Sequence, residues 1–322
     1  MKAYIVTSDS VNPYINLGYE EWLLQKNKED EVVFYLWQNQ HTVVIGKNQN
    51  AFKEAKVAQL ESTGGSLARR SSGGGAVYHD LGNLNFTFIA SDALYDVNKQ
   101  LNVIITALKK LGIDARFAGR NDIEVEGCKV SGNAFAKSNG NSLHHGTLLV
   151  NVQMDQLANY LNVSKAKMSS KGVDSVRKRV ANLISFNPEL SIDILKETLV
   201  ESFKEVYQTE LIPLTMDTTE IKPIIDKYAS EQWRLNKLSS FDAQLETKFS
   251  WGEIQAFFTI HQGFIVENQI FSDAMSVELI EQLKSVWTQI PYDKQAMKQA
   301  ARHLDDSLIS DILHELFEEV TS

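Results

Sequence analysis

The chain has 322 residues, of which 43% are hydrophobic and five are proline, so it can bury a sizeable core in one large and one small domain. A net charge of −9 argues against a general nucleic-acid-binding protein, and no stretch approaches the roughly 18 apolar residues of a membrane span. Cys128 is the single cysteine, which excludes an internal disulfide. Because the chain also starts without a signal-peptide pattern, we expect a cytoplasmic protein.

Charge is distributed unevenly along the chain. From Leu245 to Ser322 there are five Lys or Arg and thirteen Asp or Glu, whereas residues 1–244 hold 27 basic and 28 acidic residues. This change in composition predicts a large domain over residues 1–244 and a small accessory domain over residues 245–322.

Strands are predicted where β-branched and aromatic residues run together. In chain order these runs are YIVTS, EVVFYLW, HTVVIG, AVYHD, LNFTFIA, DIEVEGCKVSGNAFA and HHGTLLVNV. Only a short turn separates EVVFYLW from HTVVIG, so we expect these two to form a β-hairpin. The run DIEVEGCKVSGNAFA predicts two strands with a tight turn at Gly127.

Helices are predicted between and after these strands. They cover, in order, residues 16–26, 53–62, 95–111 and, with one basic interruption, 154–238. Asn16 is the expected N-cap of the first helix, and Gly64-Gly65 is the expected stop after the second.

The C-terminal part begins with three strand-like runs, AQLETKFS, EIQAFFTIHQ and FIVENQI. Helices are expected near residues 277–288, 293–301 and 307–320. The whole pattern predicts an α+β protein, in which a large N-terminal domain has a central mixed β-sheet flanked by helices and a small C-terminal domain is also α+β.

The stretch RRSSGGGAVYHDLGN, residues 69–83, has the composition of an anion-binding element. Three consecutive glycines are expected where φ must be positive or where another molecule lies against bare backbone. Arg69, Arg70 and Ser72 precede the glycines, and a strand that can be buried follows them. Fixed charge, hydroxyls and exposed amides can together hold an anion at a sheet edge. The alternative is a glycine-rich surface turn, which the flanking residues disfavour.

Lys129 lies among small residues in EGCKVSGNAFA, so a ligand can approach its ammonium closely. The alternative is a solvated lysine at a hairpin tip. Asn121 and Asp122 begin the same strand pair, which favours a functional site. The Asp122 carboxylate suits a hard cation such as Mg²⁺, or it caps its own backbone.

His144 and His145 are adjacent on a predicted strand, so only one of them can face a given pocket. We choose His145 because it shares its face with Thr147, and we expect His144 to be structural. The segment from Ser164 to Val180 carries six Lys or Arg and one Asp. It is either a solvated helix face, an anion-handling loop or a dock for an acidic protein.

In this order and spacing, RRSSGGGAVYHDLGN, GRNDIEVEGCKVSGNAFA, HHGTLLVN, LANYL and KGVDSVRKRVANL resemble the lipoate–protein ligase A family of the biotin/lipoate ligase superfamily. The resemblance covers residues 1–244, and the remainder matches the accessory domain of the family in size and α+β pattern. It implies an enzyme that joins lipoate and ATP into lipoyl-AMP and pyrophosphate. The lipoyl group would then pass to a lysine of 2-oxoacid dehydrogenase E2 lipoyl domains or of the glycine cleavage H protein.

The resemblance also implies roles for individual residues. Lys129 would be catalytic and would bind the α-phosphate and the acyl carbonyl, Asp122 would help to hold Mg²⁺, and His79 would shape the wall near the acyl tail. The other residues of the ATP and lipoyl-adenylate site would be Arg70, Ser72, Gly74, Gly75, Ala76, Val77, Tyr78, Asn83, Asn121, His145 and Thr147. The basic segment would cover the adenylate and exclude water.

Cys128 leaves a second hypothesis, because related lipoyl or octanoyl transferases carry the acyl group on a cysteine. On one strand, Cys128 and Lys129 would point to opposite faces, so we interpret the cysteine as a packing residue. A third hypothesis is a protein that has lost catalysis and only binds lipoate or a lipoyl domain.

Overall fold

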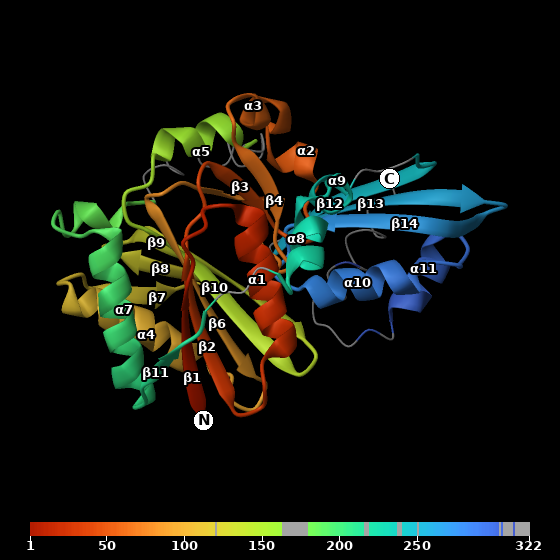
Figure 1. The fold of residues 1–322 in the computed structure, drawn as a ribbon. Helices are drawn as coiled ribbons and strands as arrows, with labels where there is room; N and C mark the ends of the chain where they lie inside the picture. The colour runs from red at the N-terminus through yellow and green to blue at the C-terminus, as the bar shows by residue number, and fades with distance from the viewer. Residues whose placement is uncertain are drawn as a thin grey trace.

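The structure, a computed structural model, describes residues 1–119, 121–162, 180–215, 219–236, 240–249, 251–302, 304 and 312. It confirms the α+β class, with a large mixed sheet and a small C-terminal antiparallel sheet (Figure 1). Apart from Val180 and Ile312, the predicted basic segment and the predicted helix at 307–320 lie outside the described residues. No helix in these described ranges is long and apolar enough to cross a membrane.

The large sheet has eight strands among the described residues, in the spatial order β11-β1-β2-β6-β10-β9-β8-β7. In that order the strands are Leu211–Pro213, Lys2–Thr7, Glu31–Trp37, Asn83–Ser91, Asn141–Leu149, Cys128–Ser138, Asp122–Val125 and Ala115–Ala118. β1 is parallel to β11 and to β2, and the other neighbouring pairs are antiparallel. The sheet is therefore mixed, as predicted.

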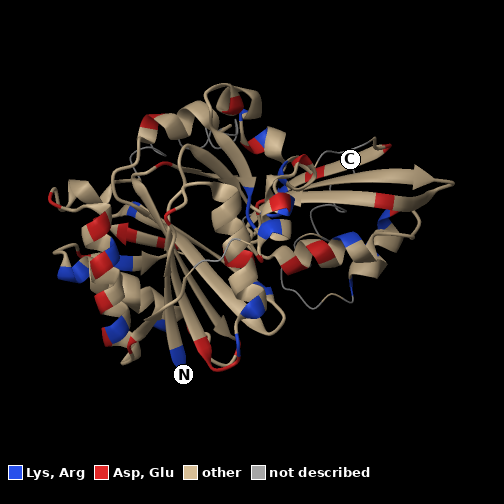
Figure 2. Cartoon of the chain, in the orientation of Figure 1, with Lys and Arg blue, Asp and Glu red and all other residues tan. Residues whose placement is uncertain are grey.

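Helices cover both faces of the large sheet (Figure 1). On one face lie α4 (Val97–Lys110) and α7 (Ile192–Tyr207), and on the other lie α1 (Pro13–Lys26) and α8 (Lys222–Ala229). In β2, Phe34 packs in the core with α4 and α7, whereas Tyr35 packs in the core with α1. Burial on both faces explains the unbroken apolar run EVVFYLW. Figure 2 shows the charges mainly on helices and strand ends, away from the middle of this sheet.

The predicted hairpin between EVVFYLW and HTVVIG is wrong. The second run is β3 (Thr42–Ile45), which belongs to a separate small sheet with the order β4-β3-β5. In it β3 is parallel to β4 (Ser66–Arg69) and antiparallel to β5 (Val77–His79). β2 pairs instead with β1 and β6. Each of the two runs therefore pairs with other segments of the chain, and the short connection between them does not indicate that they pair with each other.

The helix ends also differ from the prediction. Asn12, rather than Asn16, caps α1, because its side chain accepts a hydrogen bond from Tyr14 N at 2.9 Å and Pro13 follows it. Asn16 lies buried inside the helix and donates to Gln38 O at 2.8 Å. Where one helix was expected over residues 53–62, the chain forms two short ones. The short helices of the described large domain are α2 (Ala51–Glu54), α3 (Val57–Ser62), α5 (Met154–Tyr160), η1 (Leu183–Ser185) and α9 (Glu231–Leu235).

The C-terminal domain packs two helices on one face of its sheet (Figure 1). Its described elements are β12 (Ala243–Phe249), β13 (Gly252–His261), β14 (Phe264–Ser272), α10 (Val277–Val286) and α11 (Lys294–Ala301). The three strands match the three predicted runs. The predicted boundary after residue 244 falls inside β12, and where the two domains divide stays a prediction.

The turn after β14 rests on the triple-glycine stretch of the large domain. Gly74 N donates to Ala274 O at 3.1 Å, and Ser272 N donates to Asn48 O at 2.8 Å. A Cβ atom on Gly73 would lie only 2.4 Å from Met275 O. Glycine at position 73 is therefore required by a contact between the two domains.

Candidate active site

A cavity of about 160 Å³ opens between β5, β9, β10 and the glycines before β5. Most residues predicted for the site line this cavity, namely Arg70, Gly74, Gly75, Ala76, Val77, His79, Asn121, Lys129, His145 and Thr147. The small sheet supplies one wall and the large sheet the other. The fold thus brings together motifs that are far apart in the sequence.

Each of the three glycines meets a different requirement. Gly73 presses against the C-terminal domain, as described above. Gly74 has a φ of +87°, a conformation that side-chain-bearing residues rarely adopt. Gly75 is exposed, and a Cβ atom on it would meet nothing within 4 Å. We call Gly73–Gly75 the glycine ribbon; its last residue leaves bare backbone at the cavity.

The Arg70 guanidinium holds the ribbon in shape. It donates from Nη2 to Gly73 O at 2.6 Å and to Gly75 O at 2.8 Å, and from Nε to Ser72 Oγ at 3.0 Å. Arg70 is buried, and burial lowers its pKa from 12.5 to about 10, so it stays charged at neutral pH. Its charge therefore lies directly beneath the peptide groups of the ribbon.

Arg69 points away from the cavity. It donates to five backbone carbonyls, those of Gly46, Lys47, Gln49, Trp233 and Arg234. No carboxylate among the described residues pairs with it, and burial lowers its pKa from 12.5 to about 10. The fixed charge expected beside the glycines thus comes from Arg70, while Arg69 joins the loop after β3 to the end of α9.

Lys129 lies at the start of β9 and lines the cavity. Its Nζ is 2.7 Å from Asp122 Oδ1, and both side chains are about one-third exposed. The tight turn before it has positive φ at Glu126 (51°) and Gly127 (79°), which confirms the predicted turn at Gly127. A Cβ atom on Gly132 would lie 3.1 Å from Lys129 Nζ, so the small residue leaves room for the ammonium. Cys128 is not among the described residues that line the cavity.

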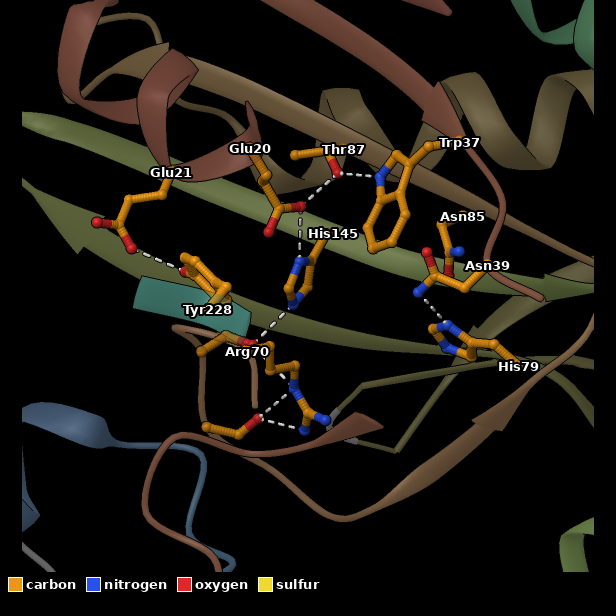
Figure 3. Close-up of polar contacts among 12 residues, drawn as sticks. Glu20, Glu21, Trp37, Asn39, Arg70, His79, Asn85, Thr87, His145 and Tyr228 are labelled. Atoms are coloured by element: carbon orange, nitrogen blue, oxygen red, sulfur yellow. Dashed lines mark hydrogen bonds and ion pairs between the residues drawn. The ribbon is translucent and has the colours of Figure 1, made fainter. Parts of the chain in front are cut away.

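His145 rather than His144 lines the cavity, as predicted from the strand alternation. His144 lies on the other face of β10, with its ring against Phe88 and Phe135. The Nε2 atom of His145 is 2.7 Å from Ser72 Oγ, and its Nδ1 is 2.8 Å from a carboxylate oxygen of Glu20 (Figure 3).

Four predicted residues lie beside the cavity and are not among the described residues that line it. Ser72 and Asn83 are buried behind it, where Asn83 Nδ2 donates to Asn85 Oδ1 at 3.0 Å. Tyr78 points away and its hydroxyl lies 2.9 Å from His41 Nδ1. Asp122 reaches the site through its ion pair with Lys129.

Several residues of the cavity were not predicted as site residues from the sequence. The described lining also includes Leu17, Trp37, Val44, Asn85, Gly132, Asn133, Ala134 and Gly146. Glu20 lies behind the lining and is 1% exposed. One signal could have found it: Leu17, Glu20 and Leu24 share one helix face, and a carboxylate on an apolar face needs a partner.

Burial makes His79 a determinant of stability at low pH. Desolvation, and after it the positive charge of Arg70, lowers its pKa from 6.5 to about 3. The unfolded imidazole takes up a proton below pH 6.5, while the folded one stays neutral down to about pH 3. Unfolding therefore binds a proton in this window, and stability falls as the pH decreases. We expect His79 to account for a loss of about 2 kcal/mol between pH 7 and pH 5.

Urea unfolding at both pH values checks this expectation. The variant His79→Gln should lose about 2 kcal/mol less than the wild type over the same interval. Equal losses in the two proteins would contradict a neutral, buried His79.

Comparison with known proteins gives matches along both parts of the chain. Residues 12–204 match the family described as "Lipoyl protein ligase A/B catalytic domain", and residues 239–320 match "Bacterial lipoate protein ligase C-terminus". Lipoate-protein ligase A of Psychrobacter cryohalolentis is 43% identical over 309 residues, which cover 92% of this chain and 91% of that protein. The protein of the same name from Blochmanniella pennsylvanica is 36% identical over 304 residues, covering 91% and 90%.

Solved structures give the same result. The structure of P. falciparum LipL1 in complex with lipoate has a TM-score of 0.87 at 28% identity, covering 98% of this chain and 100% of that chain. A lipoate-protein ligase A bound with ATP has a TM-score of 0.65 at 27% identity, covering 74% and 100%. The chain therefore belongs to the lipoate–protein ligase A family.

Proposed function

We propose that Lys129 and the glycine ribbon together neutralise the acyl phosphate that forms when this ATP-dependent lipoate–protein ligase activates its substrate. In the first step a lipoate carboxylate oxygen attacks the α-phosphorus of ATP, and pyrophosphate leaves. In the second step the amine of an acceptor lysine attacks the acyl carbon, and AMP leaves. Both steps concentrate negative charge at one phosphate, so their barriers are largely electrostatic.

The observation that supports this proposal most directly is that Lys129 lines the same cavity as Gly74 and Gly75 of the ribbon. Its ammonium is compact, lies on a flexible stem and has the small residue Gly132 beside it. The bare backbone at Gly75 faces the same cavity. A cation and peptide amides held in place before reaction stabilise developing charge without reorganising.

Asp122 is the residue that would hold Mg²⁺. No cluster of three or more His, Cys, Asp or Glu that could hold a metal occurs in the described ranges of the chain. Mg²⁺ is commonly bound through one or two carboxylates together with substrate phosphates, so a single carboxylate beside Lys129 fits this use. When bound, Mg²⁺ would neutralise phosphate charge. Asp122 also holds the Lys129 ammonium at the cavity.

The proposed acceptors are E2 lipoyl domains of 2-oxoacid dehydrogenases and the glycine cleavage H protein. An archaeal bipartite lipoate protein ligase described with its E2 lipoyl domain, from Thermoplasma acidophilum, is similar to this chain with a TM-score of 0.67 at 29% identity. Such acceptors and a single cysteine agree with a cytoplasmic enzyme.

One assay separates this function from a thioester route. Pyrophosphate should be released only when lipoate and ATP are both present, and the Cys128→Ser variant should modify an apo-lipoyl domain at the wild-type rate, because Cys128 is not among the described lining residues. A mass increase on Cys128 during turnover, together with loss of transfer in Cys128→Ser, would favour the transferase. Wild-type protein that binds lipoate without releasing pyrophosphate would contradict catalysis.

A further inference from the structure

A chain of hydrogen bonds runs from the glycine ribbon to the carboxylate of Glu20. In the neutral imidazole, Nδ1 of His145 carries the proton, because the carboxylate of Glu20 can only accept. Its Nε2 then accepts from Ser72 Oγ at 2.7 Å. Ser72 Oγ in turn accepts from Arg70 Nε at 3.0 Å (Figure 3). Every proton in this branch points toward Glu20.

A second branch reaches the same carboxylate oxygen from another wall of the cavity. Trp37 Nε1 donates to Thr87 Oγ1 at 3.0 Å, and Thr87 Oγ1 donates to Glu20 Oε1 at 2.6 Å. Trp37 lines the cavity, and Thr87 and Glu20 are both buried. Glu20 Oε1 is therefore the common acceptor for two walls of one site.

The distances from Ser72 to His145 and from His145 to Glu20, 2.7 and 2.8 Å, resemble those of a serine–histidine–acid triad. Nucleophilic catalysis needs an accessible serine oxygen. Ser72 is 0% exposed and is absent from the described lining of the cavity, and its oxygen already accepts from Arg70. Ser72, His145 and Glu20 therefore orient Arg70 and do not attack a substrate.

We propose that Glu20 is a positioning residue for the formation of lipoyl-AMP. By fixing the proton on Nδ1 of His145, it keeps Nε2 free to accept from Ser72, which keeps the oxygen lone pairs of Ser72 turned toward Arg70. Arg70 then holds the carbonyls of Gly73 and Gly75 and so fixes the peptide groups that face the cavity. Without the carboxylate, the proton of His145 can move to Nε2 and Ser72 can turn its hydrogen toward Arg70. Arg70 then no longer holds the glycine ribbon in its shape. The inference rests on the proposed function.

The neighbouring Glu21 offers a matched control. It lies on the same helix one residue later and points to the outer side, where its carboxylate binds Lys227 Nζ at 2.6 Å and Tyr228 OH at 2.8 Å (Figure 3). It has the same side chain and also accepts two hydrogen bonds, but neither partner is His145, Ser72 or Arg70. A Glu21 variant therefore measures how much stability is lost when a carboxylate is removed from α1, without disturbing the hydrogen bonds that lead to the ribbon.

Lipoate-dependent pyrophosphate release, normalised to folded enzyme, tests the proposal. We expect kcat to fall about 100-fold in Glu20→Ala with the KM for ATP nearly unchanged, because misplacing reacting groups acts mainly on the transition state. Glu20→Gln keeps an acceptor oxygen and should restore kcat to within about tenfold of wild type. Glu21→Ala should lose stability and keep the wild-type kcat. The double variant Glu20→Ala/Ser72→Ala should lose no more kcat than the worse of the two single variants, because both changes break the same chain of hydrogen bonds.

Two results would overturn the positioning role. One is a Glu20→Ala enzyme with the wild-type kcat, and the other is a double variant whose loss equals the product of the two single losses. If Glu20→Ala does not fold, ¹⁵N NMR of histidine-labelled wild-type enzyme decides, since a proton on Nε2 of His145, with or without one on Nδ1, contradicts the proposal and a proton on Nδ1 alone supports it. A wild-type enzyme without lipoate-dependent pyrophosphate release would refute the proposed function instead.

Discussion

Lys129→Ala is expected to reduce lipoate-dependent pyrophosphate release about 1,000-fold, the loss that follows removal of one preorganised donor from a developing anion. The ammonium of Lys129 lines the cavity and lies 2.7 Å from Asp122, so it is held in place before substrate binds. Arginine at this position should not restore the rate, because its guanidinium presents its donors in a rigid planar fork, whereas the lysine ammonium is compact and lies on a flexible stem. Pyrophosphate release at saturating lipoate and ATP is the measurement.

Lys137→Ala provides the control for this variant. Lys137 lies on the same strand, β9, but it is exposed and is not among the described residues that line the cavity. Its loss should leave the rate within twofold of wild type, about the scatter of such assays. An undiminished rate in Lys129→Ala would remove the residue on which the proposed chemistry depends.

Arg69→Met should lower the melting temperature by about 10 °C, which corresponds to about 4 kcal/mol for a domain of this size. Arg69 is 2% exposed, and its guanidinium donates to five backbone carbonyls, including Gln49 O at 2.6 Å and Trp233 O at 2.8 Å. Methionine fills a similar volume but leaves these buried acceptors without their donor, and each unsatisfied group is costly. Thermal unfolding followed by tryptophan fluorescence measures the effect, because Trp233 Nε1 itself donates to Arg69 O.

Lys222→Met is the matched surface change. Lys222 pairs only with Asp226 in the described structure, and the two side chains are 73% and 62% exposed. Exposed pairs of this kind contribute little, so the melting temperature should move by less than about 2 °C. An equally small shift in Arg69→Met would show that the loop after β3 and the end of α9 do not depend on the buried guanidinium.

The residues predicted to contact a ligand are the ones most visible in the sequence. Glycines in a row, a lysine among small residues and a histidine that shares its face with Thr147 are uncommon locally, because close approach of a ligand restricts residue types over a few positions. The structure places Gly75, Lys129 and His145 around one cavity, as these signals predict. Their chemical roles stay a prediction until the variants are measured.

Long-range pairing is what the sequence did not reveal. β2 and β3 are close in the chain, but they lie in different sheets, because each is bordered by strands that come from distant segments. Trp37 and Glu20 were missed for the same reason: their partner, Thr87, is 50 or more residues away. The short strand β11 was hidden within a region of helical pattern and is identified only by its pairing with β1.

A crystal structure with a non-hydrolysable analogue of lipoyl-AMP tests the central claim most directly. We predict that Lys129 Nζ contacts the phosphate of the analogue and that the peptide backbone at Gly75, the last residue of the ribbon, faces the same group. A phosphate bound elsewhere, with the Lys129 ammonium turned into solvent, would contradict it.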